Sequence, residues 1–179
     1  MRMPDVNVLV YAHREETVDH ARYAQWLIEL ANGPEPFALS ELVLHGFLRI
    51  VTHSRIFNPP STSAQAFKFL NSLLELRTCT LIRPGPHHWG IFRQLCEGGN
   101  LRGKIIADAV HAALAIESGC EWVSGDTDFL DSLRRCAGPT FKLNHCDSGK
   151  PPSHRYLSGA VPSILVLQQR AWCGKCSKD

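Results

Sequence analysis

The sequence predicts an α/β domain over residues 1–146. Short apolar runs alternate there with longer amphipathic stretches, which is the pattern of strands and helices that follow one another along a chain. With 179 residues, 44% of them hydrophobic and 20% charged, the chain can bury a sizeable core and has an ordinary globular composition. Its apolar runs are all far shorter than the roughly 20 residues of a membrane-spanning helix.

The N-terminal run, residues 6–11, has two interpretations. Its Val, Leu and Tyr residues favour a strand on propensity alone. Alternatively, Pro4 and Asp5 end a very short strand, and Asn7 caps a helix that follows. These residues by themselves leave both interpretations open.

The remaining elements follow from periodicity and from turn residues. Ser40 is a suitable N-cap, and Thr62 and Gln65 have the spacing of a capping box. Gly33 and Gly119 end the helices that precede them. Helices are predicted over residues 20–32, 40–53, 62–76, 87–97 and 104–118, and strands over 37–39, 79–82, 122–124 and 140–143.

The composition changes after Cys146. Residues 147–154 are rich in Pro, Gly and Ser, as linkers are. Residues 147–179 carry five Lys and Arg against two Asp, whereas residues 1–146 carry a net charge of −1. We therefore expect a basic, flexible C-terminal extension over 147–179. The net charge of the whole chain is only +2, so any contact with an acidic partner such as a nucleic acid would depend on local basic patches.

The seven cysteines indicate a reducing compartment. Their number is odd and their spacing irregular, so no disulfide framework is predicted. The apolar run 6–11 is too short for the core of a secretory signal. We expect reduced thiols in a cytoplasmic protein.

Acidic residues stand at four separate places along the chain, most of them where a predicted element begins or ends. They are Asp5, Glu41, Asp108 and the pair Asp126 and Asp128. Carboxylates that meet in a folded interior repel one another unless a cation neutralises them. Without a His or Cys ligand set, the expected cation is Mg²⁺ or Mn²⁺, and the usual chemistry of such ions is phosphoryl or phosphodiester transfer.

Each acid also has a purely structural interpretation. Glu41 lies in a first helical turn, where the helix dipole favours an acid. Asp108 shares a helix face with apolar residues, which is costly, but it is also spaced for an ion pair with Lys104. Asp126 and Asp128 follow Gly125 after a predicted strand, in a position that suits either a polar turn or a ligand site at the edge of a parallel sheet.

Four segments in order resemble a PIN-domain ribonuclease and, more narrowly, the toxin of bacterial VapBC toxin–antitoxin pairs. They are PDVNVLVYA at 4–12, SEL at 40–42, IADAVHAALA at 106–115 and SGDTDF at 124–129. The resemblance covers roughly residues 1–143 and leaves 147–179 without a counterpart. It implies a three-layer α/β/α sandwich around a central, mostly parallel sheet, with a strand that ends at Asp5 and a helix after it.

The resemblance also implies a site and partners. Its catalytic acids would be Asp5, Glu41, Asp108 and Asp126, with Mg²⁺ or Mn²⁺, one ion or two, on Asp5, Asp108 and Asp126. Asn7, Thr127 and Asp128 would be auxiliary residues. The implied partners are an RNA substrate (a tRNA or a ribosomal RNA), a cognate VapB-like antitoxin and a second copy of the chain.

Arg102 and Lys104 precede the helix that bears Asp108, so they are candidate contacts to RNA phosphates. A solvated loop is the simpler interpretation of both residues.

Two other functions remain open. A haloacid-dehalogenase-like phosphatase would use Asp5 as nucleophile, but Asn7 would then replace its general acid. A zinc or binding module would use His145, Cys146, Cys173 and Cys176, which have paired spacing but an irregular gap between the pairs.

Overall fold

A computed structural model describes residues 1–125 and the backbone of residues 143–145. These residues form one five-stranded sheet and six helices. In chain order the elements are β1 Arg2–Pro4, α1 Val6–His13, α2 His20–Asn32, β2 Phe37–Ser40, α3 Glu41–Val51, α4 Ser63–Leu74, β3 Cys79–Ile82, α5 His88–Gly99, α6 Ile105–Glu117, β4 Glu121–Ser124 and β5 Leu143–His145.

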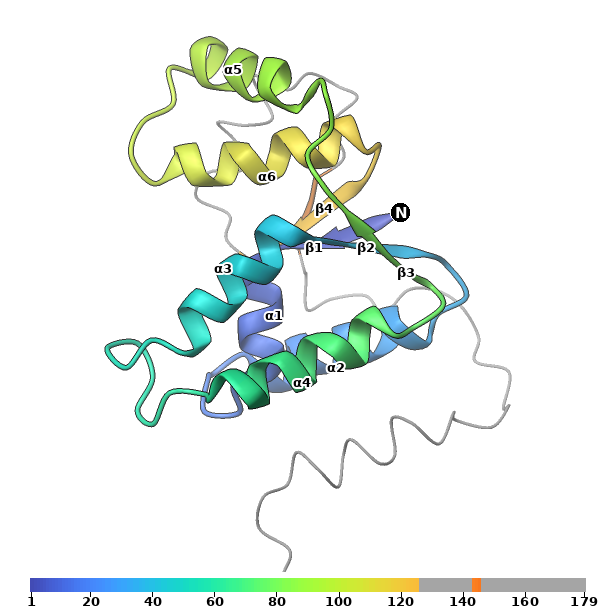
Figure 1. Ribbon diagram of the computed structural model, residues 1–179, viewed down its shortest axis with the longest axis vertical. Helices are drawn as coiled ribbons and strands as arrows, with labels where there is room; N and C mark the ends of the chain where they lie inside the picture. Colours follow the sequence, from blue (N-terminus) through green and yellow to red (C-terminus); the bar gives the residue numbers. More distant parts are fainter. Residues whose placement is uncertain (126–142, 146–179) are drawn as a thin grey trace, which may run out of the picture. The chain divides into compact units, whose positions relative to one another are not determined.

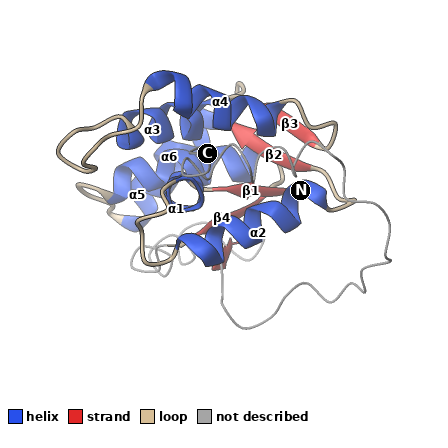
Figure 2. Cartoon of the chain, turned by 90° about the horizontal axis from the view of Figure 1, so that it is seen from below, coloured by secondary structure: helices blue, strands red, loops and turns tan. Residues whose placement is uncertain are grey.

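The sheet has the strand order β3-β2-β1-β4-β5, and all of its neighbouring strands are parallel. The strands can be followed side by side from β3 to β4 in Figure 2. Residues Trp122, Val123 and Ser124 of β4 pair with 143–145, so β5 begins where the predicted strand 140–143 was to end. The start of β5 is set by its backbone pairing with β4. Residue propensity alone predicted a start three residues nearer the N-terminus.

Alternate residues of the strands face opposite sides of the sheet and enter two separate cores. Phe37, Leu39 and Val123 pack with the helices α1 to α4. Met3 and Trp122 pack on the other side with α5 and α6. Figure 1 shows these two groups of helices on opposite sides of the strands. Burial of both faces is typical of parallel sheets, and it confirms the predicted three-layer α/β/α fold.

The helices lie close to the predicted ranges, and their caps explain why. Ser40 accepts a hydrogen bond from the backbone N–H of Leu42, and Thr62 and Gln65 form the expected capping box. Helix α2 spans the predicted residues 20–32, and the largest shift is two residues, at the ends of α3, α4 and α5. None of the described helices is long and apolar enough to cross a membrane.

The N-terminal segment is a three-residue strand followed at once by α1. The interpretation of residues 6–11 as a strand is therefore wrong, and the order implied by the family resemblance is confirmed. Asp5 is the N-cap of α1, since its side chain accepts from the backbone N–H of Val6. Val8, Leu9 and Ala12 of this helix are fully buried, so tertiary packing overrides their strand propensity.

The expected extension 147–179 lies outside the described residues and stays a prediction. Among the described cysteines, Cys79, Cys96 and Cys120 are free thiols, as expected. Burial raises the pKa of the Cys79 thiol to about 11, so this thiol is inert at neutral pH.

Candidate functional site at the carboxyl edge of the sheet

The candidate site lies where the parallel strands end. The residue that follows each of the first four strands is Asp5, Glu41, Arg83 and Gly125 in turn. Because the strands are parallel, these residues meet at one edge of the sheet, where ligands bind in open α/β folds. Register sets the neighbours: Pro4 pairs with Val123, which places Asp5 beside Ser124, and Ser40 pairs with Ile82, which places Glu41 beside Arg83.

Asp5 is a buried carboxylate, with 5% of the residue exposed. Its Oδ1 accepts a hydrogen bond from the backbone N–H of Val6 at 2.7 Å, and its Oδ2 accepts one from the Ser124 hydroxyl at 2.8 Å. Its own backbone N–H donates to the carbonyl of Val123 at 2.8 Å. Hydrogen bonds on both oxygens fix the orientation of the carboxylate.

Asn7 joins Asp5 to the end of β4. Its side-chain Nδ2 donates to the Ser124 hydroxyl at 3.0 Å, and its Oδ1 accepts from the backbone N–H of Gly125 at 3.1 Å. Ser124 is fully buried, and its hydroxyl donates to Asp5, so the three side chains form one chain of hydrogen bonds. Asn7 thus holds Ser124 and Gly125 at the end of β4, and its auxiliary role in a site stays a prediction.

Two glycines allow helices to approach the site closely. A Cβ on Gly125 would overlap the hydroxyl of Tyr23 in α2 and lie 2.8 Å from its Cζ. A Cβ on Gly46 in α3 would lie 2.8 Å from Cγ2 of Val6, the residue next to Asp5. Space for a side chain is absent at both positions, so the glycines are needed for packing rather than for an unusual φ.

Glu41 is the first residue of α3 and is paired with Arg83. The Nε of Arg83 lies 2.6 Å from Oε1 of Glu41, and the two side chains are 66% and 37% exposed. Glu41 also has the favourable first-turn position that its structural interpretation required.

Asp108 lies in the first turn of α6. The helix dipole therefore favours it as it favours Glu41, and its placement is less costly than expected. Asp108 is partly exposed, whereas Ala112 and Ala115 on the same face are buried.

Of the other predicted site residues, some lie on the surface and some outside the described part. Arg102 and Lys104 are exposed, and Arg102 donates to the Oδ1 of Asn100 at 3.2 Å. Asp126, Thr127 and Asp128 fall outside the described residues. Within the described residues, no three His, Cys, Asp or Glu side chains form a group that could hold a metal ion, so the complete ligand set stays a prediction.

Two residues at this edge were missed as site residues by the sequence analysis. Ser124 and Arg83 are common residue types without a distinctive spacing, and only the strand register places them beside Asp5 and Glu41. The detectable signal was their position: each stands at or directly after the end of a predicted strand.

Comparison with known proteins identifies the family. The model of the PIN domain matches residues 2–132. The chain is 44% identical over 125 residues to VapC ribonuclease Mb2897 of Mycobacterium bovis, which covers 70% of this chain and 85% of that protein. It is 39% identical over 129 residues to ribonuclease VapC25 of Mycobacterium tuberculosis, covering 72% and 91% of the two chains.

Solved structures agree on the fold. A chain of VapBC2 from Rickettsia felis, crystallised with a DNA fragment from its promoter, superposes with a TM-score of 0.57 at 20% identity, covering 80% of this chain and 97% of that one. VapC20 of Mycobacterium tuberculosis, a toxin that cleaves the sarcin–ricin loop, gives 0.53 at 11% identity, covering 72% and 91%.

The phosphatase alternative loses its support at Asn7, which hydrogen-bonds to Ser124 and Gly125 as a structural clamp. The zinc alternative rests on side chains outside the described set. The family match spans the whole edge from Asp5 to Ser124 and continues to residue 132. The chain belongs to the PIN-domain family, among the VapC ribonucleases.

Proposed function

We propose that this chain is a metal-dependent endoribonuclease that hydrolyses RNA phosphodiester bonds in the cytoplasm as the toxin of a toxin–antitoxin pair. One observation carries the proposal: the buried carboxylate of Asp5, held by Ser124 and the start of α1 at the carboxyl edge of a PIN-family sheet. Burial of a carboxylate lowers the stability of the fold. A carboxylate held in one orientation at this edge is well placed to bind a cation.

The donor chemistry of the edge suits a hard divalent ion. Asp5, Asp108 and Asp126 would hold Mg²⁺ or Mn²⁺ through carboxylate oxygens, which these ions prefer. A phosphate would be repelled by these acids alone, so a cation between them is required for substrate to approach. When bound, such an ion neutralises charge on the scissile phosphate and acidifies a water molecule.

The protein's own residues orient this chemistry. Ser124 and Asn7 hold the Asp5 carboxylate in one rotamer, and such outer contacts tune the affinity of a metal site. Thr127 and Asp128 are assigned the same auxiliary role, and Glu41 is assigned to the wall of the site rather than to the ion.

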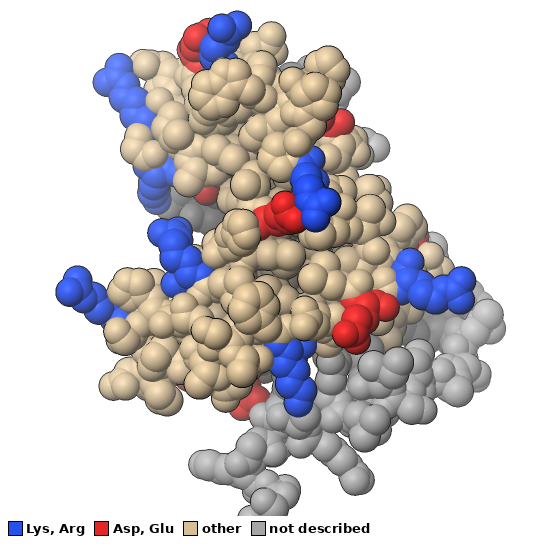
Figure 3. All heavy atoms as spheres, in the orientation of Figure 1, with Lys and Arg blue, Asp and Glu red and all other residues tan. Residues whose placement is uncertain are grey.

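The proposed substrate is a structured RNA, a tRNA or a ribosomal RNA loop. VapC20 is named for cleavage of the sarcin–ricin loop, and the relatives at 39–44% identity are named ribonucleases. On the face drawn in Figure 3 the Lys and Arg side chains are separated by other residues and do not form one continuous basic patch. Arg102 and Lys104, just before α6, are two proposed contacts to the RNA.

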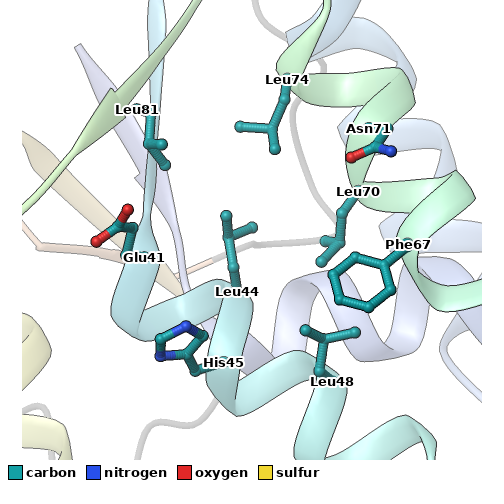
Figure 4. A pocket seen from close by; sticks show the side chains of 9 residues that line it. All are labelled: Glu41, Leu44, His45, Leu48, Phe67, Leu70, Asn71, Leu74 and Leu81. Atoms are coloured by element: carbon teal, nitrogen blue, oxygen red, sulfur yellow. The ribbon is translucent and has the colours of Figure 1, made fainter. Parts of the chain in front are cut away.

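We assign the antitoxin to an apolar groove between α3 and α4. The groove encloses about 220 Å³, and Leu44, Leu48 and Leu70 line it beside the exposed Phe67. Figure 4 shows the carboxylate of Glu41 at one end of the same groove. An antitoxin segment with apolar side chains followed by a basic one would fill the groove and reach the acidic edge. A homodimer of the toxin is also proposed and is tested by analytical ultracentrifugation.

The decisive experiment maps RNA ends after the purified full-length chain acts on total RNA. We expect cuts at defined sites with Mg²⁺ or Mn²⁺, none with EDTA, and recovery when excess Mn²⁺ is added back. Cleavage that persists in EDTA contradicts the metal-dependent mechanism. A phospho-aspartate trapped at Asp5 would support the phosphatase alternative instead.

A further inference from the structure

Arg83 occupies a defined place at the carboxyl edge. It is the first residue after β3, and the pairing of Ser40 with Ile82 brings it next to Glu41. The two side chains form an ion pair with 2.6 Å between Nε and Oε1. The basic side chain of Arg83 thus lies beside Glu41, one of the acids that the PIN resemblance implies, at the edge where the proposed RNA substrate would pass.

The backbone that carries Arg83 is held on both sides. Strand β3 precedes it, and the strap that follows (residues 83–87) contains Pro84 and Pro86, which restrict the backbone. The Glu117 carboxylate accepts hydrogen bonds from the backbone N–H groups of Gly85 and His87, each at 2.8 Å. A Cβ on Gly85 would lie 2.7 Å from Oε1 of Glu117, so a side chain here would displace the carboxylate that holds the strap. The backbone at Arg83 is therefore held in place on both sides.

The ion pair contributes little to the stability of the fold. The Arg83 side chain is 66% exposed, and exposed pairs of this kind contribute about 0–1 kcal/mol. The ion pair joins Glu41 to Nε of Arg83, and two thirds of the Arg83 side chain is exposed to solvent. A guanidinium paired through Nε still has two terminal nitrogens, which can donate to a phosphate as a fork.

We propose that Arg83 binds an RNA phosphate next to the one that is cut, and that Glu41 positions the Arg83 guanidinium for this contact. The inference rests on the proposed nuclease function and deepens it by assigning a substrate-binding residue. A contact to a neighbouring phosphate is made equally before and during the reaction, so its loss raises KM and leaves kcat nearly unchanged.

Arg93 provides a matched control. Its side chain is also 66% exposed, and its Nε is also paired with a carboxylate, that of Glu97 at 4.0 Å, but it lies on α5 and not after a strand. Arg83→Gln and Arg93→Gln therefore remove the same charge from equally exposed positions. Thermal unfolding of both variants verifies that they stay folded.

The test uses a fluorescent RNA oligonucleotide taken from a site that the wild-type chain cuts. We expect Arg83→Gln to raise KM about tenfold with kcat within about twofold, and Arg83→Lys to recover part of the loss. Glu41→Gln should raise KM as well, because the guanidinium loses its support. With cleavage blocked by Asp108→Asn, anisotropy titrations in KCl should show a salt slope lower by about 0.7 when Arg83→Gln is added. Arg93→Gln should change none of these values.

The outcomes separate this inference from the proposed function. If the wild type cuts RNA and Arg83→Gln behaves like Arg93→Gln, Arg83 is not a phosphate contact. A fall in kcat with KM unchanged also overturns the proposal, because it places Arg83 at the reacting phosphate or in a structural role. A wild-type chain that cuts no RNA overturns the nuclease function together with this inference.

Discussion

Ser124 donates a hydrogen bond to Oδ2 of Asp5 at 2.8 Å across 119 residues of sequence. The contact joins the last residue of β4 to the residue after β1, and Asn7 donates to the same Ser124 hydroxyl. The orientation of the buried Asp5 carboxylate therefore depends on the pairing of two central strands.

Replacing Ser124 with Ala should weaken catalysis and stability together. The Asp5 carboxylate and the Asn7 amide each lose a buried partner, which costs about 1–3 kcal/mol of unfolding free energy. Loss of an outer contact of this kind lowers metal affinity or activity about 10- to 100-fold. Cleavage rates over a Mn²⁺ titration and chemical denaturation measure the two effects. Ser54→Ala, at an exposed position in the turn after α3, is the control, and equal behaviour of the two variants would contradict the assigned role.

Asp108→Asn should abolish cleavage in a folded protein. The substitution keeps the size of the side chain and removes its charge, so a rate loss of at least about 100-fold is expected. Removal of a first-turn acid costs about 0.3–1 kcal/mol, too little to unfold the chain. Glu97→Gln on α5 changes an exposed acid in the same way and should leave the rate unchanged. Full activity in Asp108→Asn would remove this residue from the mechanism.

Gly125→Ala should damage the site through Tyr23. The new methyl group would overlap the tyrosine hydroxyl, and relief of such overpacking typically costs about 1–3 kcal/mol. Tyr23→Phe in the same chain should restore part of the lost stability, and a double-mutant cycle measures the coupling. Gly90→Ala, where nothing lies within 4 Å of the new methyl, should instead stabilise α5 by about 0.5–1 kcal/mol. Additive effects of the Tyr23 and Gly125 changes would exclude the steric explanation.

His13 should make the fold less stable in acid. Burial lowers the pKa of its imidazole to about 4 from the usual 6.5, and its ring packs against Phe47 and Phe69. Above pH 6.5 the ring is neutral in both states, so its contribution to stability is complete. As the pH falls from 6.5 to 4, the unfolded chain binds a proton that the folded chain does not, and stability is lost.

The measurement is the free energy of unfolding against pH. His13→Gln, which can still hydrogen-bond to the Ser61 hydroxyl, should flatten the slope between pH 4 and 6.5. The exposed His53, replaced by Gln, is the control. Identical slopes in all three proteins would show that the His13 ring does not resist protonation.

Much of the fold could be predicted because local signals and tertiary structure agree. The periodicity of residues 20–32 and the apolar run 79–82 gave the observed bounds of α2 and β3. Residues 6–11 could not be assigned from their own pattern, because a short apolar run is consistent with a strand and with a buried helix. The Asp5 cap and the burial of Val8 and Leu9 decide for the helix.

The structure places Asp5 and Asn7 at the carboxyl edge of the sheet, where the resemblance to PIN domains implied that a strand ends at Asp5. Their roles in a site stay predictions. The contacts of Ser124 and Arg83 depend on long-range register, which leaves no local trace in the sequence. The position of Asp108 within its helix depended on a helix start that periodicity fixes only approximately.

The placement of β1 beside β4 also determines when during translation the nuclease can exist. A nascent chain that has reached residue 120 contains Asp5 and Glu41 but has no Ser124 to orient the first and no Gly125 for Asn7 to hold. A nascent chain that ends before Glu121 therefore lacks the strand that completes the surroundings of Asp5 and Asn7, and it should have no nuclease activity.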